Sequence, residues 1–136
     1  MILIVDSFAW IEFLTGSLHE ERIRELLATA DVVVTPDLVL AEVARKLARG
    51  GVGVGLVRRK VEDVSTLSRV APITVETAVG VFEADTALRQ SARSRHLERP
   101  GLSDAVILST ARLLHGVVLT GDPHFEGFPE TMWLGS

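Results

Sequence analysis

Residues 101–125 read GLSDAVILSTARLLHGVVLTGDPHF, and this stretch decides the class of fold. Apolar side chains recur at helical spacing from Ala105 to Leu114, which predicts a largely buried helix. The run VVLT (117–120) then favours a buried strand, and Asp122 follows it in a segment that is either a turn or a short helix. A helix that leads directly into a buried strand is typical of an α/β fold.

The same alternation extends outward along the chain. It predicts strands over residues 2–5, 32–34, 70–74, 117–120 and 131–134. It predicts helices starting at Ser7, Leu18, Pro36, Leu56, Val75 and Ser103, with Ser7 and Ser103 as the capping residues of the first and the last. The fifth is one helix or two, because Gly80 interrupts it. Pro72 places the third strand at an edge. Strands that alternate with helices imply a largely parallel sheet with right-handed crossovers.

The composition is that of one globular domain over residues 1–136. The chain is 47% hydrophobic, enough to bury an ordinary core, and it contains no cysteine, which excludes disulfides, thiolate catalysis and cysteine-based zinc sites. The first apolar run ends at Asp6, too early for a signal peptide or a membrane span, so we expect a cytoplasmic protein with no membrane partner. The net charge of −4 argues against non-specific coating of DNA.

Four acidic residues stand where such a fold would gather them. Asp6 and Asp122 follow strands, at the sheet edge where ligands bind, and Glu42 and Asp104 lie on helices. At an effective dielectric constant near 20, two such charges about 5 Å apart would repel by roughly 3 kcal/mol. A divalent cation would make the cluster tolerable, and oxygen ligands favour Mg²⁺ or Mn²⁺ over zinc.

Three of the four acids also have an explanation without a metal. Asp104 fits a first-turn acid that the helix dipole favours, and Asp122 fits the start of a turn. Glu42 fits an ion pair with Arg45 or Lys46 on an exposed helix face. The joint placement of the acids favours a site, in which a carboxylate free of the metal, either Glu42 or Asp104, would orient the attacking water.

Basic residues form two stretches. Arg45, Lys46 and Arg49 share a helix face with Glu42, and they form either a solvated face or a line of phosphate contacts leading to the metal. The second stretch precedes Asp104 and consists of Arg89, Arg93, Arg95 and Arg99.

Four segments, taken in order, resemble the successive motifs of the PIN-domain family and in particular its small VapC-type toxins: IVDSFAWIEF (4–13), TPDLVLAEV (35–43), residues 101–125 and TMWL (131–134). The resemblance is nearly full length. It implies a three-layer α/β/α fold with a mainly parallel sheet of about five strands, one or two Mg²⁺ or Mn²⁺ ions, RNA as substrate, an antitoxin protein as partner and a homodimer. By position, it assigns metal binding and catalysis to Asp6, Glu42, Asp104 and Asp122, with Ser7 and Thr120 as supporting hydroxyls.

The chain departs from that family pattern at His124. Many members carry a further carboxylate two residues after the last acid, where this chain has histidine. Loss of an anionic oxygen ligand would weaken a second metal site. His124 is therefore either a surface residue or a contact to metal-bound water or substrate phosphate.

The function indicated is a metal-dependent endoribonuclease that serves as the toxin of a toxin–antitoxin pair. A housekeeping RNA-processing nuclease would carry the same residues, and a neighbouring antitoxin gene would separate the two. A phosphoacceptor signalling domain, from a different class, needs adjacent acids after the first strand, whereas Asp6 is followed by Ser7. A non-catalytic binding domain would not need four intact acids.

Overall fold

The computed structural model describes residues 1–135 and contains one five-stranded parallel sheet. The strand order is β3-β2-β1-β4-β5, so the first strand of the chain is central and the third is at an edge, as Pro72 predicted. Leu3 shows the parallel register, since it pairs with Val33 on one side and Val117 on the other. The strands are β1 (Ile2–Val5), β2 (Val32–Pro36), β3 (Arg69–Ala71), β4 (Val117–Thr120) and β5 (Thr131–Trp133).

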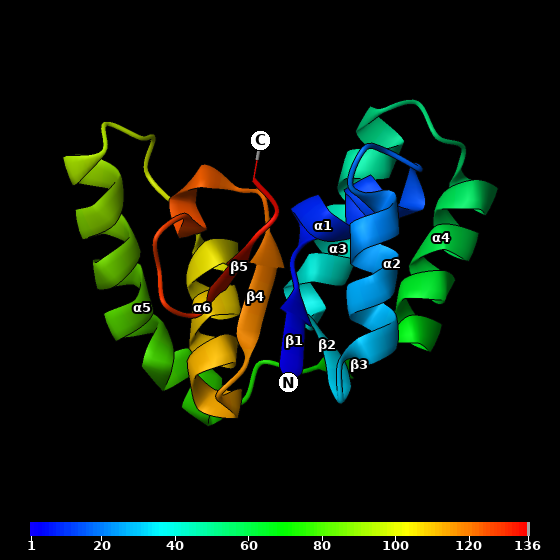
Figure 1. Ribbon diagram of the computed structural model, residues 1–136. Helices are drawn as coiled ribbons and strands as arrows, with labels where there is room; N and C mark the ends of the chain where they lie inside the picture. Colours follow the sequence, from blue (N-terminus) through cyan, green and yellow to red (C-terminus); the bar gives the residue numbers. More distant parts are fainter. Residues whose placement is uncertain (136) are drawn as a thin grey trace.

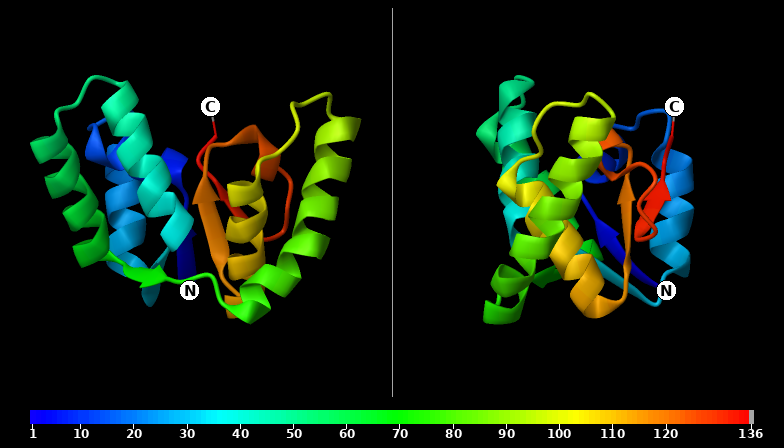
Figure 2. Two further views of the ribbon diagram at one scale, coloured as in Figure 1. Left: turned by 180° about the vertical axis from the view of Figure 1, so that it is seen from behind. Right: turned by 90° about the vertical axis from the view of Figure 1, so that its left-hand side faces the viewer.

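Helices cover both sides of this sheet. Helices α1 to α4 gather on one side and α5 and α6 on the other (Figure 1), and the view from behind shows the same division (Figure 2). The three-layer α/β/α prediction is therefore confirmed. The helices are α1 (Ser7–Leu14), α2 (Glu20–Thr29), α3 (Asp37–Arg49), α4 (Val54–Leu67), α5 (Val75–Ser94), α6 (Leu102–Leu114) and the short 3-10 helix η1 (Pro123–Phe125). Among the described residues, none of the helices has the length and apolar character needed to cross a membrane.

The centre of the sheet is apolar on both faces. Leu3, Ile4 and Val5 of β1 are fully buried, as is Leu119 of β4, and burial of each such side chain stabilises the fold by about 1.5–3 kcal/mol. Val5 pairs with Leu119, so β1 and β4 end side by side. Their shared end brings the residues that follow each strand, Asp6 after β1 among them, to the same edge of the sheet.

Gly80 does not divide α5, which is one continuous helix. The reason is its packing against α6: a Cβ atom at residue 80 would lie 2.4 Å from Oγ of Ser109. That hydroxyl donates a 2.8 Å hydrogen bond to the carbonyl oxygen of Thr77. The glycine is therefore a point of close helix contact, and its low helix propensity is offset by the packing it allows.

Candidate metal centre

Asp6 lies at the junction of β1 and α1 and is only 3% exposed. Its Oδ1 accepts a 2.9 Å hydrogen bond from the backbone N–H of Ala9, so Asp6 caps α1 and the predicted cap, Ser7, does not. Burial raises the pKa of Asp6 to about 7. Hydrogen bonds from Thr120 and Ala9 oppose this rise, and repulsion from Asp122 adds to it. In the metal-free protein this carboxyl group is thus partly protonated near neutral pH.

Asp122 follows β4 and caps η1. Its backbone N–H donates to Oγ1 of Thr120 at 2.9 Å, and its Oδ1 accepts from the backbone N–H of His124 at 3.0 Å. The same Oδ1 lies 2.8 Å from Nδ1 of His124, whose Nε2 lies 2.8 Å from the carbonyl oxygen of Glu98. Burial lowers the pKa of His124, but the hydrogen bonds to Glu98 and Asp122 outweigh it, and the net pKa is raised. Both ring nitrogens face acceptors, as suits the doubly protonated ring.

Asp104 lies in the first turn of α6, and its Oδ2 accepts a 2.9 Å hydrogen bond from the backbone N–H of Gly101, the N-cap residue. The prediction that Ser103 caps this helix is therefore wrong. Its hydroxyl instead donates a 2.9 Å hydrogen bond to Oε2 of Glu42 on α3. Burial raises the pKa of Asp104, and repulsion from Asp122 and Glu42 acts in the same direction.

These acids meet at a cleft of about 600 Å³ between α3 and α6. Ligand atoms of Asp104, Asp122 and His124 lie within 4.8 Å of one another and make the tightest grouping of the site. Glu42 lines the same cleft, and Asp6 is coupled to the group through its repulsion with Asp122. The lining residues are Leu38, Ala41, Glu42, Arg45, Gly101, Leu102, Ser103, Asp104 and Asp122.

The basic residues of α3 separate into three environments. Arg45 lines the cleft. Lys46 turns toward α1, where its Nζ donates a 2.8 Å hydrogen bond to Oγ of the buried Ser7. Arg49 is exposed at the last residue of the helix. The three side chains therefore make different contacts, and Lys46 lies next to the acidic centre, where it lowers the pKa of Asp6.

In a comparison against protein families, residues 3–130 match the PIN domain. The chain belongs to the PIN domain family. A comparison with curated proteins gave no significant sequence match.

Solved structures share the fold of this PIN domain at low sequence identity. A chain of the VapBC2 structure from Rickettsia felis, bound to a DNA fragment from its promoter, has a TM-score of 0.72 and 16% identity, with 100% of this chain and 99% of that chain covered. VapC20 of Mycobacterium tuberculosis, described as a sarcin-ricin loop cleaving toxin, has a TM-score of 0.67 and 22% identity, with 94% and 97% covered. A toxin–antitoxin complex from Klebsiella pneumoniae has a TM-score of 0.68 and 20% identity, with 96% and 95% covered.

The donor set of this PIN domain suits a hard divalent cation. Carboxylate oxygens dominate it, as Mg²⁺ and Mn²⁺ require. The pKa values of Asp6 and Asp104 are raised, chiefly by burial and further by repulsion from Asp122, so ionisation of these carboxyl groups is disfavoured in the metal-free protein. A divalent ion bound among these acids would lower their pKa values and favour the ionised carboxylates.

Two polar contacts of the PIN-domain site were not predicted from the sequence. The hydrogen bond from Ser103 to Glu42 joins residues 61 positions apart, and no local pattern signals it. The contact from Lys46 to Ser7 had a signal: Lys46 is one helical turn beyond Glu42 on the same face, and Ser7 adjoins Asp6.

Proposed function

We propose that residues 1–136 form a single nuclease domain that hydrolyses RNA phosphodiester bonds with the help of one or two Mg²⁺ or Mn²⁺ ions. The observation that carries this proposal is the convergence of four acids from four separate segments on the edge of a parallel sheet beside an open cleft. Ligands bind at this edge in open α/β sheets. Carboxylates crowded beside a cleft favour a metal-dependent reaction on a phosphate ester.

The roles of the side chains follow from their contacts. Asp6, Asp104 and Asp122 would hold the metal. Asp6 and Asp104 are each repelled by Asp122, and a cation bound among the three carboxylates would relieve this repulsion. A divalent ion bound there would supply Lewis-acid activation of the attacking water and neutralise charge on the phosphate. Glu42, whose Oε2 accepts a hydrogen bond from Ser103, would accept a proton from that water.

The supporting hydroxyls have a structural part in this proposal. The Oγ1 of Thr120 accepts from the backbone of Asp122, and the same hydroxyl hydrogen-bonds to the carboxyl group of Asp6. Thr120 would thereby fix the two strand-end acids relative to each other. Ser7 would hold the ammonium group of Lys46 beside Asp6, and Arg45 would attract substrate phosphate into the cleft.

The direct test is incubation of the purified protein with end-labelled structured RNAs in Mg²⁺, in Mn²⁺ and in chelator. Cleavage should require the metal and should be lost in Asp104→Asn, which keeps the size of the side chain and removes its charge. Asp63→Asn, an exposed change on α4, is the matched control and should cleave as the unmodified protein does. Cleavage that persists in chelator would refute the metal requirement.

We further propose that the nuclease is a VapC-type toxin, cytoplasmic and paired with an antitoxin protein. The support is the likeness to the toxin–antitoxin structures from Rickettsia felis and Klebsiella pneumoniae. Induced expression should arrest growth, and coexpression of the product of a short adjacent gene should restore it. A nuclease that is harmless when expressed alone would instead be an RNA-processing enzyme.

A homodimer is the remaining part of the proposal. Val75, Val79 and Phe82 lie on one face of α5 and are 76%, 67% and 78% exposed, an apolar stripe that a second copy would cover. Sedimentation analysis should show a dimer, and Phe82→Glu should shift it toward monomer. A monomer at micromolar concentration in the unmodified protein would reject this part alone.

A further inference from the structure

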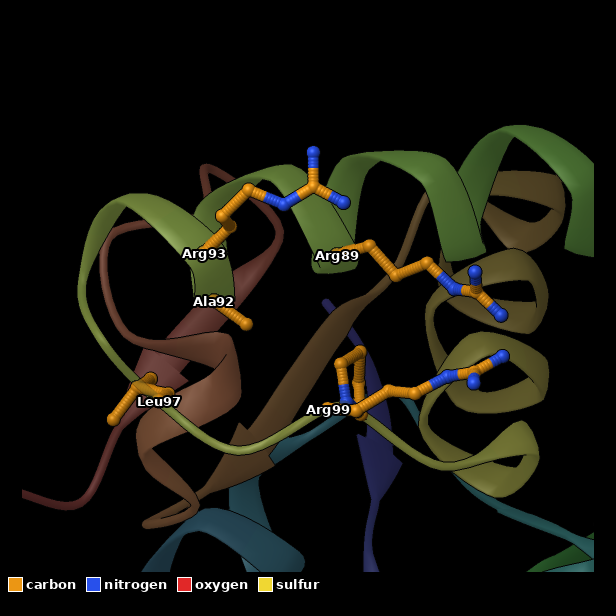
Figure 3. Close-up of a pocket in the computed structure, with 6 residues that line it drawn as sticks. Arg89, Ala92, Arg93, Leu97 and Arg99 are labelled. Atoms are coloured by element: carbon orange, nitrogen blue, oxygen red, sulfur yellow. The ribbon is translucent and has the colours of Figure 1, made fainter.

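A second pocket, of about 340 Å³, lies between the C-terminal half of α5 and the loop that leads to α6. Figure 3 shows three of its lining arginines: the side chains of Arg89 and Arg99 extend in the same direction, and that of Arg93 extends in a different one. The other lining residues, Ala92, Leu97 and Pro100, are apolar, and Ala92 and Pro100 are buried. Guanidinium groups beside apolar side chains suit a phosphate with an adjoining base, because arginine binds phosphate in a bidentate manner and stacks on flat rings.

The charges of this pocket are only partly balanced. Arg89 pairs with Asp85 at 2.9 Å, an exposed i,i+4 contact of small energetic value. Within the described residues, Arg93 and Arg99 have no salt bridge. Arg95, by contrast, turns away and binds the carboxylate of Glu126 at 2.9 Å. Two of the arginines that line the pocket, Arg93 and Arg99, therefore carry charges that no carboxylate in the described residues neutralises.

The loop that forms this pocket also borders the acidic cleft. Arg99 and Pro100 line the pocket, and the next residue, Gly101, lines the cleft. The loop is fixed to the strand-end acids by the contact of His124 with the carbonyl oxygen of Glu98 at 2.8 Å. The pocket and the acidic centre are thus held in one fixed arrangement, a short stretch of chain apart.

We infer that the pocket of Arg89, Arg93 and Arg99 is a phosphate subsite for the RNA strand that flanks the scissile bond. This rests on the proposed nuclease function and names a feature of its substrate: the strand must extend beyond the cleaved bond far enough to reach the arginines. The ligand is the sugar–phosphate backbone of RNA. The neighbouring acidic cleft would bind RNA in the proposed reaction, and a strand leaving that cleft along the shared loop would reach this pocket. Such contacts add affinity with little dependence on base sequence.

The test compares Arg93→Ala/Arg99→Ala with Arg22→Ala, an exposed arginine on α2 far along the chain from the pocket. Anisotropy of a labelled single-stranded RNA of about 16 nucleotides, the length class of single-strand sites, is measured in chelator so that no cleavage occurs. The double variant should bind roughly tenfold or more weakly, and the slope of log K against log salt should fall by about 0.7 for each phosphate that the variant no longer binds. Arg22→Ala should match the unmodified protein.

A second pair of substitutions separates charge from geometry. Arg93→Lys/Arg99→Lys keeps both charges, so the salt slope should be retained while the affinity falls, because lysine cannot bind phosphate in a bidentate manner. In Mn²⁺, the preference of the unmodified protein for a 16-nucleotide RNA over a 4-nucleotide RNA, as a ratio of kcat/KM, should shrink in the double alanine variant.

Three results would overturn the inference. The first is binding and salt slope equal to those of Arg22→Ala. The second is an unchanged length preference in a protein that does cleave RNA, which leaves the nuclease function intact and removes the subsite. The third concerns a polyglutamate peptide used as a second probe. If the double alanine variant lost binding to this peptide while its RNA binding stayed unchanged, the pocket would be assigned to an acidic protein partner. Failure of the unmodified protein to cleave any RNA would count against the nuclease function, while the anisotropy measurement still tests the pocket.

Discussion

The Nζ atom of Lys46 lies 2.8 Å from Oγ of Ser7, so α3 places a positive charge beside the first turn of α1. The ammonium group lowers the pKa of Asp6, against the larger effect of burial that raises it. Lys46 therefore acts inside the acidic centre of the metal-free protein. A cation so close to the cluster is also placed to meet negative charge on the phosphate as the reaction proceeds.

Replacing Lys46 with methionine should consequently affect the reaction step as well as RNA binding. We expect kcat at saturating RNA to fall roughly tenfold or more, because a positive charge near the developing negative charge is removed. Arg49→Met is the control, since Arg49 is exposed at the end of the same helix. Single-turnover cleavage measures the step. A rise in KM with kcat unchanged would show that Lys46 only contributes to binding.

The metal-free protein should lose stability as the pH rises through 7. The pKa of Asp6 is about 7 in the folded protein against 3.8 when unperturbed, so the folded state favours the protonated carboxyl group. That contribution is complete below about pH 4 and is lost as the pH passes the folded pKa. Between pH 6 and 8 the loss should be roughly 1.4 kcal/mol. The raised pKa values of Asp104 and His124 act in the same direction.

Urea unfolding followed by tryptophan fluorescence in chelator at pH 6 and pH 8 measures this loss. The stability of Asp6→Asn should depend less on pH than that of the unmodified protein, because this substitution removes the carboxyl group whose pKa is raised to about 7. A free energy of unfolding that is equal at the two pH values in the unmodified protein would contradict the prediction.

Local sequence patterns located the strands and the order of the acids because both depend on short-range features. The apolar runs of β1 and β4 end where an acid begins a turn, and parallel pairing then brings the strand ends together. The assignment of helix caps failed for Ser7 and Ser103, since a carboxylate supplied the capping contact in both places. A serine cap stabilises a helix by only about 1 kcal/mol, and Ser103 satisfies its hydroxyl group on a distant helix instead.

Gly80 should tolerate no side chain while Ser109 faces it. Gly80→Ala would place a Cβ atom 2.4 Å from Oγ of Ser109, and we expect it to destabilise the fold by about 1–3 kcal/mol despite the better helix propensity of alanine. The double variant Gly80→Ala/Ser109→Ala should recover most of the loss, because the clashing Oγ is gone, the Cβ of residue 109 lies at an ordinary 3.6 Å, and alanine suits the interior of α6. Thermal unfolding of the single and double variants gives the coupling, and simple additivity would rule out the clash.

Mn²⁺ should stabilise the folded protein through the acidic centre. At a free concentration one hundred times the dissociation constant, linkage gives about 2.7 kcal/mol. The affinity should strengthen between pH 6 and 8, since the metal competes with the proton of Asp6. A melting temperature insensitive to millimolar Mn²⁺ would contradict a metal site in the folded protein, and an equal shift in Asp104→Asn would place the ion elsewhere.

His124 should determine how many ions the free protein holds. Its ring bonds to Asp122 and to the carbonyl oxygen of Glu98, so it occupies the space beside Asp122 with a nitrogen donor in place of an anionic oxygen. We expect calorimetry with Mn²⁺ to show one tight site per chain. His124→Asp should lower the metal-free melting temperature, because two carboxylates and a carbonyl oxygen would then face one another, and it should add a second tight ion. His124→Asn adds no charge, so it should lower the metal-free melting temperature by less than His124→Asp does and should bind no second ion. Two equally tight ions in the unmodified protein would show that His124 does not limit the site.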